Sequence, residues 1–260
     1  MYGAILGDLA GSIYEFSQIK NVSNVDVKEL LTKDSFFSDD TILTIAILDC
    51  ILHKGNYEHY LKKYANEMMN YKPDVKPYFK TTFSPNFIKW VNGEELGNSS
   101  GNGAMMRISP IGYLFNNEND IRRNVIMATS PSHNDLDAID AANIIAMIIF
   151  YSRKGYSKED IIKKLDLNIC FKEFESFNYK CNDTIDNCLY AFFNSNSLED
   201  AIKKVISYGG DTDTNACIVG SMSEAYYGIS DEYKNKINEY LPNDFVNILD
   251  NGYKKIKNLK

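Results

Sequence analysis

Hydrophobic residues recur every three to four positions along almost the whole chain, a spacing that predicts α-helices throughout. Alternating patterns bounded by hairpin turns and long internal repeats are not evident. The predicted helices cover, approximately, residues 2–14, 39–53, 57–70, 103–114, 118–129, 135–152, 157–165, 183–194, 197–207, 213–227 and 231–250. Segment 15–38 is predicted to be irregular and segment 71–102 to be rich in loops, but neither has the composition of an interdomain linker. We therefore expect one compact all-α domain, a helical bundle over residues 1–260.

Two of the predicted helices are apolar on nearly all sides, which is typical of helices buried in the centre of a fold. The helix 39–53 begins in Ser38-Asp39-Asp40-Thr41, and the helix 213–227 begins in Gly209-Gly210-Asp211-Thr212-Asp213-Thr214-Asn215. Two buried helices therefore start in dense groups of carboxylate and hydroxyl oxygens.

Two interpretations of these acids compete. Asp, Ser and Thr cap helix N-termini and contribute about 1 kcal/mol each, but one aspartate per helix would suffice for capping. The four carboxylates Asp39, Asp40, Asp211 and Asp213 would repel one another if the two helix ends converged. A hard metal ion held by oxygen ligands is the usual resolution of such repulsion, so convergence would favour a metal site over capping.

The residue types available narrow the choice of metal. The chain has three histidines and no closely spaced cysteine pair, so oxygen ligands favour Mg²⁺, Mn²⁺ or Ca²⁺ over Zn²⁺. An EF-hand is excluded, because Ala216 and Met222 stand where that loop requires Gly and Glu.

The first predicted helix carries glycines four residues apart, at Gly3, Gly7 and Gly11, which places them on one face. Each glycine inside a helix costs about 1 kcal/mol relative to alanine, so three of them imply that another helix or a ligand approaches closely. The helix is expected to end at Glu15, which is either a solvated acid or part of a site. Asp8 is expected to be structural or to support metal ligands.

Two further segments are candidates for ligand contacts. Gly101-Asn102-Gly103-Ala104-Met105-Met106-Arg107 is a glycine-rich turn that either presents backbone N–H groups to a phosphate or is a plain loop or cap. It is not a Walker A motif, and Met106 stands where a dinucleotide-binding fingerprint needs glycine. His133 lies just before the most apolar predicted helix, where it either contacts a ligand or helps to cap that helix.

The charge balance limits the partners. Lys and Arg number 28 against 35 Asp and Glu, which gives a net charge of −7 and an isoelectric point near 5.1. This argues against extended nucleic-acid or anionic-membrane binding, and a phosphate-bearing ligand would need local cations. The most apolar stretch, Ala141–Tyr151, is too short to span a bilayer, and the N-terminus does not resemble a signal peptide. Five cysteines without a closely spaced pair favour core thiols and a cytoplasmic location.

Taken together and in this order, the motifs resemble the ADP-ribosylglycohydrolase family, which includes dinitrogenase reductase-activating glycohydrolase. The matching segments are Gly7-Asp8-x-x-Gly11-Ser12-x-x-Glu15-Phe16, Ser38-Asp39-Asp40-Thr41, Gly101-Asn102-Gly103-Ala104-Met105-Met106-Arg107, Ser132-His133 and Gly209-Gly210-Asp211-Thr212-Asp213-Thr214-Asn215. The resemblance covers residues 1 to about 228 and implies an all-α fold of the ADP-ribosylglycohydrolase type.

The resemblance also implies roles for individual residues. Two divalent cations, Mg²⁺ or Mn²⁺, would be bound by Ser38, Asp39, Asp40, Asp211, Asp213 and Thr214. The acids expected to take part in catalysis are Glu15, Asp39 and Asp211. The diphosphate of ADP-ribose would be bound by Gly101, Asn102, Gly103, Ala104, Met105 and Arg107, and His133 would contact the ADP-ribose. The implied reaction is hydrolysis at C1 of the distal ribose of an ADP-ribosylated protein side chain or a small ADP-ribose conjugate. Apart from the resemblance, a monomer is the simplest expectation.

Two alternatives stand beside this hypothesis. A relative that only binds ADP-ribose or serves a structural role would be expected to lose acids from the metal set, whereas this chain has all of them. A metal-dependent phosphohydrolase would usually show His-Asp ligand pairs, and this chain has none. The chain departs from many family members at Ser38, where Thr is common, and at Asp135, where a second His often follows. The linkage to arginine, serine, an acetyl group or a nucleobase stays open.

Overall fold

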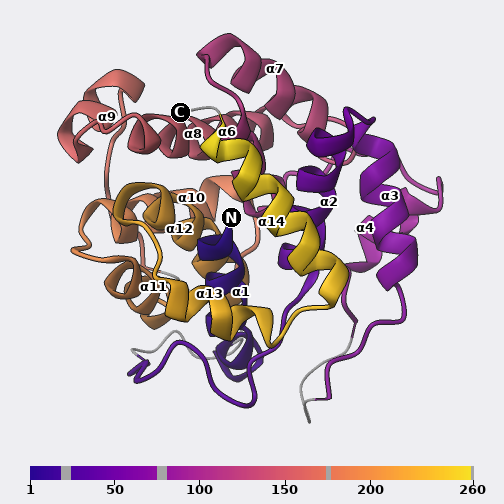
Figure 1. The fold of residues 1–260 in the computed structure, drawn as a ribbon, viewed down its shortest axis with the longest axis horizontal. Coiled ribbons are helices and arrows are strands. Elements are labelled where there is room, and N and C mark those ends of the chain that lie inside the picture. The colour runs from indigo at the N-terminus through magenta and orange to yellow at the C-terminus, as the bar shows by residue number, and fades with distance from the viewer. Residues whose placement is uncertain (19–24, 75–80, 174–176, 259–260) are drawn as a thin grey trace.

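The computed structural model describes residues 1–18, 25–74, 81–173 and 177–258 (Figure 1). Its helices are α1 (Tyr2–Gln18), α2 (Asp39–His53), α3 (Tyr57–Met68), α4 (Pro85–Val91), α5 (Gly103–Met106), α6 (Ser109–Leu114), α7 (Glu118–Thr129), α8 (Leu136–Arg153), α9 (Lys158–Leu165), α10 (Cys181–Phe193), α11 (Leu198–Ser207), α12 (Thr212–Tyr227), α13 (Asp231–Asn238) and α14 (Asn243–Lys257). These residues form no β-strand, only isolated bridges between Asn98 and His133 and between Gly101 and Lys180. The all-α prediction is confirmed, and the single domain over residues 1–260 stays a prediction.

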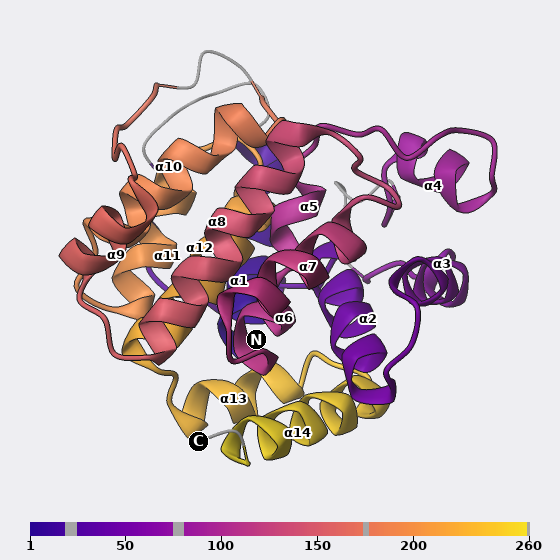
Figure 2. The same cartoon turned by 90° about the horizontal axis from the view of Figure 1, so that it is seen from above.

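Helices α1 and α12 lie in the middle of the molecule, with α3 and α4 towards one side and α9 towards the other (Figures 1 and 2). Every residue from Asp40 to Ile51 in α2 and from Thr212 to Glu224 in α12 is buried. The prediction of two central helices is therefore confirmed. None of the helices in the described ranges has the length and hydrophobicity needed to cross a membrane.

The glycine stripe of α1 packs against α12, so the close neighbour is another helix. A methyl group built on Gly7 would lie 2.0 Å from the carbonyl oxygen of Ala216, and one on Gly11 would lie 2.3 Å from that of Thr212. At the other end, Gly3 meets Gly220 in the same way. As the residue numbers of the contacts rise along α1, those of their partners fall along α12, so the two helices are antiparallel. Their backbones are in direct contact. Continuing this register by one turn brings Glu15 to the beginning of α12.

The prediction of one helix over 103–114 is wrong, because the segment divides into α5 and α6 at Arg107 and Ile108. Pro110 has no backbone N–H to donate to the carbonyl of Met106, the residue four positions before it. That carbonyl instead accepts hydrogen bonds from Thr44 Oγ1 at 3.3 Å and Cys217 Sγ at 3.4 Å. The break therefore ties the glycine-rich turn to α2 and α12.

Three other boundaries differ from the predictions. The helix expected over 231–250 is divided by Pro242 into α13 and α14, and α14 continues to Lys257. The segment 71–102 was predicted to be loop-rich, yet it contains α4, which Ser84 caps by accepting from Phe87 N at 3.3 Å. Segment 15–38 is helical at its start, because α1 continues to Gln18.

The cysteines behave largely as predicted. All five are free thiols, and Cys170 alone among them is not fully buried. They contribute small core side chains, not disulfide bonds.

Candidate functional site

Six carboxylates gather where the end of α1 meets the beginnings of α2 and α12. They are called here the acid cluster: Asp8, Glu15, Asp39, Asp40, Asp211 and Asp213. One oxygen each of Asp8, Asp40 and Asp213 lie within 4.8 Å of one another, and so do one oxygen each of Glu15, Asp211 and Asp213. The two groups share Asp213. The sequence left open whether the starts of α2 and α12 converge. The fold brings their four aspartates together, and adds Asp8 and Glu15 from α1.

Capping does not account for these acids. Ser38 is the N-cap of α2, and its Oγ accepts from Asp40 N at 3.2 Å. Asp211 stands at the N-cap position of α12, but its side chain makes no capping hydrogen bond. Its carboxylate instead accepts from Asn102 Nδ2 at 2.7 Å. The capping interpretation therefore leaves Asp39, Asp40, Asp211 and Asp213 unexplained.

Asp8 has a positioning role that its spacing in the sequence did not reveal. Its carboxylate accepts from Ser38 N at 3.0 Å, Ser38 Oγ at 2.8 Å, Thr41 N at 3.1 Å and Thr41 Oγ1 at 2.5 Å. Both oxygens are thus engaged in holding the first turn of α2 against α1. This confirms the structural part of the expectation for Asp8 and fixes the position of Asp40.

Asp40 has a carboxylate oxygen that accepts no hydrogen bond from the described residues. Its Oδ2 accepts from Ser38 Oγ at 3.1 Å and from Thr214 Oγ1 at 3.2 Å. Its Oδ1 is buried and has no hydrogen-bond partner among the described residues. Leaving a buried carboxylate oxygen without a partner is costly, so this atom calls for a positively charged ligand. The predicted ligands Ser38 and Thr214 thus lie beside the same carboxylate.

The electrostatics of the acid cluster point the same way. Burial, followed by repulsion from Asp211 and Asp39, raises the pKa of Glu15 to about 9. Burial and the nearby Asp8 and Asp211 raise the pKa of Asp39 to about 8, while Arg107 opposes that shift. The pKa values of Asp40 and Asp213 are also raised, chiefly by burial. Buried carboxylates that repel one another fit hard divalent cations, which supply the missing charge.

Asn102 joins the glycine-rich turn to this cluster, and residues 179–181 form backbone hydrogen bonds with the turn. Asn102 N donates to Tyr179 O at 2.7 Å, and Cys181 N donates to Ser100 O at 2.9 Å. Gly101 N donates to Ser99 Oγ at 3.1 Å. The N–H groups of Gly101 and Asn102 are therefore already used within the protein. These hydrogen bonds between residues 179–181 and the glycine-rich turn could not be predicted from the sequence.

Most of the other residues predicted to bind the ligand are buried. Ala104, Met105 and Arg107 are fully buried. The Arg107 guanidinium donates to Ser132 Oγ at 2.7 Å and to Ala128 O at 3.4 Å. His133 is also buried, and it is not the cap of α8, because Asp135 accepts from Ala138 N in that role. Binding of a diphosphate by the glycine-rich turn, and contact of His133 with ADP-ribose, stay predictions.

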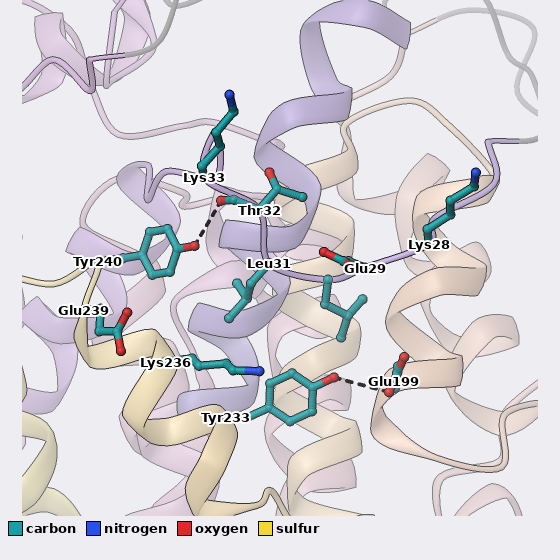
Figure 3. A pocket seen from close by; sticks show the side chains of 11 residues that line it. Lys28, Glu29, Leu31, Thr32, Lys33, Glu199, Tyr233, Lys236, Glu239 and Tyr240 are labelled. Atoms are coloured by element: carbon teal, nitrogen blue, oxygen red, sulfur yellow. Dashed lines mark hydrogen bonds between the residues drawn. The ribbon is translucent and has the colours of Figure 1, made fainter.

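A separate cavity of about 550 Å³ lies between residues 28–33, α11 and α13 (Figure 3). Its lining includes three lysines and three glutamates. Tyr233 OH donates to Glu199 at 3.2 Å, and Tyr240 OH donates to Thr32 O at 3.0 Å. The cavity shares no residue with the acid cluster and has no comparable group of converging carboxylates among the described residues, so we place the functional site at the acid cluster.

Comparison with known proteins identifies the architecture. A family model described as ADP-ribosylglycohydrolase matches residues 1–259. A solved structure titled as an ADP-ribosylglycohydrolase-related protein complex superposes with a TM-score of 0.69 at 17% identity, and covers 98% of this chain and 93% of that one.

Curated proteins give a consistent result at low identity. A protein of Acanthamoeba polyphaga mimivirus described as an ADP-ribosyl glycohydrolase is 26% identical over 86% of this chain and 84% of its own length. A human ADP-ribosylhydrolase is 21% identical over 87% of this chain and 84% of its own. An ADP-ribosylarginine hydrolase of Pseudomonas putida is 21% identical over 88% of this chain and 70% of its own.

Proposed function

The chain belongs to the ADP-ribosylglycohydrolase family, a family of enzymes, and from that premise we propose that it hydrolyses the bond at C1 of the distal ribose in ADP-ribosylated protein side chains or small ADP-ribose conjugates. The proposal includes two divalent cations, Mg²⁺ or Mn²⁺. The observation that supports it best is the pair of carboxylate groups that share Asp213. One shared carboxylate between two sets of buried oxygens suits a pair of neighbouring cations.

Particular residues suit each cation. Asp40, with its unpaired Oδ1, and Asp213 would bind one, beside the hydroxyls of Ser38 and Thr214. Glu15, Asp211 and Asp213 would bind the other. Asp39, also a predicted ligand, is in neither group, but its charge acts on Glu15 and Asp40. When bound, the cations supply positive charge that orients the vicinal ribose hydroxyls and offsets the charge of the acids.

The chain's own groups would perform the remaining tasks. Asn102 Nδ2 orients the Asp211 carboxylate, and Asp8 fixes the turn that carries Asp39 and Asp40. Glycosidic cleavage passes through an oxocarbenium-like transition state, which a neighbouring carboxylate stabilises while a base takes a proton from water. Glu15, Asp39 and Asp211 are the three candidates for that base.

The Gly101–Arg107 turn would hold the diphosphate, and His133 would contact the ADP-ribose. Asn102 joins this turn to Asp211, so the turn and the acid cluster are adjacent. The diphosphate at the turn and the distal ribose at the acids would then be placed by adjacent parts of the protein.

Calorimetric titration of ADP-ribose, with Mg²⁺ and then with excess EDTA, tests the proposal. Binding that requires Mg²⁺ and is lost in Asp211→Ala would support it. Asp231→Asn, at an exposed aspartate paired with Lys234, is the matched control and should bind normally. Arginine-, serine- and acetyl-linked substrates would follow, with free ADP-ribose as the expected product. No binding under any condition, or release of phosphate in place of ADP-ribose, would overturn the proposal.

A further inference from the structure

Arg107, Ser132 and His133 form a connected chain of buried polar groups that the proposed reaction does not by itself explain. Arg107 Nη2 donates to Ser132 Oγ at 2.7 Å, and Ser132 Oγ lies 2.8 Å from His133 Nδ1. Arg107 Nη2 is also 3.5 Å from the same imidazole nitrogen. Arg107 Nε and Nη1 are buried without a hydrogen-bond partner among the described residues. A buried guanidinium with unused donors is costly, so packing alone does not account for it.

The positions of the protons follow from the donors and acceptors in this chain. Arginine only donates, so Ser132 Oγ is an acceptor towards Arg107. The remaining hydroxyl proton of Ser132 then has His133 Nδ1 as its acceptor at hydrogen-bond distance. The nearby guanidinium charge also favours a lone pair, not an N–H, at Nδ1. A neutral imidazole that accepts at Nδ1 carries its proton on Nε2.

His133 Nε2 faces the two glycines of the Gly101–Arg107 turn. A methyl group built on Gly103 would lie 3.1 Å from Nε2, and one built on Gly101 would lie 3.8 Å away. The absence of side chains at these glycines keeps the space in front of Nε2 free. Nε2 itself makes no hydrogen bond to another described residue, so its donor is available to a ligand.

We propose that Arg107 and Ser132 are positioning residues that hold His133 as the Nε2–H tautomer, so that His133 donates a hydrogen bond to an anionic oxygen at the Gly101–Gly103 turn. The assignment of that oxygen to the diphosphate of ADP-ribose rests on the proposed function, whereas the tautomer does not. A fixed N–H donor needs no reorganisation when an anion arrives.

The charged surroundings keep His133 neutral. Burial, and then the Arg107 charge, lower the pKa of His133 well below its usual value. Asp39 of α2 and Cys181 of α10 act on Arg107, and Asp135 and Asp137 act on Cys181. His133 should therefore remain a donor at Nε2 over the ordinary range of assay pH, and not switch between charge states.

Nitrogen-15 NMR of histidine-labelled protein in the absence of ligand tests the tautomer directly. The chain has three histidines, so His53→Gln and His59→Gln variants assign the His133 signals. We expect a protonated Nε2 and an unprotonated, hydrogen-bonded Nδ1 from about pH 5 to about pH 8. Ser132→Ala should move the Nδ1 signal to that of an acceptor without a partner. Ser130→Ala, whose hydroxyl donates to Ile126 O on the protein surface, should leave it unchanged.

Arg107→Gln separates charge from hydrogen bonding, since glutamine keeps a donor for Ser132. We expect the Nε2–H tautomer to persist and the pKa of His133 to rise. An Nδ1–H tautomer, a protonated His133 near pH 7, or an unchanged Nδ1 signal in Ser132→Ala would overturn the proposal.

Addition of ADP-ribose with Mg²⁺ tests the donor role. We expect the Nε2–H signal to shift and Ser132→Ala to weaken binding about three- to tenfold, the range for one lost hydrogen bond. Binding that leaves the Nε2–H signal in place would overturn the donor role. If ADP-ribose does not bind at all, the proposed function fails, while the tautomer measured in the free protein still supports the Arg107–Ser132–His133 relay.

Discussion

The antiparallel pair α1 and α12 places buried acids at both of its ends, and the two ends differ in how those acids are stabilised. At one end, Glu224 accepts hydrogen bonds from the Met1 amino group, from Gly3 N at 2.7 Å and from Tyr253 OH. At the other end lies the acid cluster, where Asp40 Oδ1 has no partner in the described part of the chain. The first end is satisfied by the protein itself, and the second requires charge from outside.

The close packing of α1 and α12 explains why acids are buried at both ends of the pair. Glycines at positions 3, 7 and 11 bring α1 into backbone contact with α12, which buries whatever stands at either end. At the Glu224 end, the buried charge meets an ammonium group and two neutral donors. At the acid cluster, Asp211 accepts only neutral hydrogen bonds such as that from Asn102, and the charge of Arg107 acts on Asp39 without an ion pair between them among the described residues. Burial by the same helix pair thus produces a structural ion pair at one end and a candidate cation site at the other.

Removing the Glu224 carboxylate, which the protein itself stabilises, should have the largest effect on stability. We expect Glu224→Gln to lower the free energy of unfolding by about 3–5 kcal/mol, because it leaves the Met1 amino group buried without its counter-charge. Urea unfolding with and without Mg²⁺ measures this, and the loss should be the same in both conditions. Tyr253→Phe, which removes one neutral donor, should cost less. A loss that Mg²⁺ restores would contradict the assignment of Glu224 to structure.

Breaking the other end should affect function, not folding. Asp213→Asn removes the carboxylate shared by both groups, so we expect Mg²⁺-dependent turnover of an ADP-ribosylated substrate to fall at least about a hundredfold. In EDTA the same variant should unfold at an equal or higher urea concentration than the wild type, since one repelling charge is gone. Steady-state kinetics and unfolding on the same preparation measure both. Retained turnover would exclude Asp213 from the site.

Mg²⁺ should stabilise one end and leave the other unaffected. At a concentration one hundred times its Kd, a cation that binds only the folded protein raises the free energy of unfolding by about 2.7 kcal/mol. Thermal unfolding across a Mg²⁺ series should show this increase in the wild type and in Glu224→Gln, but not in Asp213→Asn. Equal stabilisation of all three would show that Mg²⁺ acts elsewhere.

The pH dependence should give a smaller but independent signal. Without cations, the pKa of Glu15 is raised to about 9 and that of Asp39 to about 8, whereas carboxyl groups in an unfolded chain have a pKa of about 4. The folded protein therefore binds more protons between about pH 4 and about pH 9, so the free energy of unfolding should fall as the pH rises through this window.

Unfolding in EDTA at several pH values measures that slope. Mg²⁺ should flatten it, because cations bind the ionised carboxylates. Stability that increases with pH in EDTA would contradict the raised pKa values of the acid cluster.

Much of the fold followed from hydrophobic spacing, and its errors have local causes. The boundaries of α2 and α7 were predicted to the residue, because Ser38 and Asn117 cap them and apolar periodicity starts at once. The prediction of continuous helices over 103–114 and 231–250 is wrong, because Pro110 and Pro242 lie inside these segments. Proline lacks the backbone N–H that a continuous helix needs at these positions, so each helix is interrupted although the hydrophobic spacing continues.

The sequence predicted which residue types form the site, but not which contacts each of them makes. Two acid-rich helix starts suggested convergence, yet spacing could not show that Asp8 would use both oxygens on Ser38 and Thr41, or that Asn102 would reach Asp211. Those contacts join segments 30 or more residues apart, and only tertiary packing decides them. The buried chain from Arg107 to His133 was hidden for the same reason.

The most direct test of the account is calorimetric titration of Mg²⁺, and of Mn²⁺, into EDTA-treated and dialysed protein, with Asp213→Asn and Glu224→Gln beside the wild type. We predict about two cations per chain for the wild type, with proton release on binding, the same stoichiometry for folded Glu224→Gln, and loss of binding in Asp213→Asn. No binding to the wild type at millimolar concentrations, or unchanged binding in Asp213→Asn, would contradict the claim that the acid cluster is completed by divalent cations.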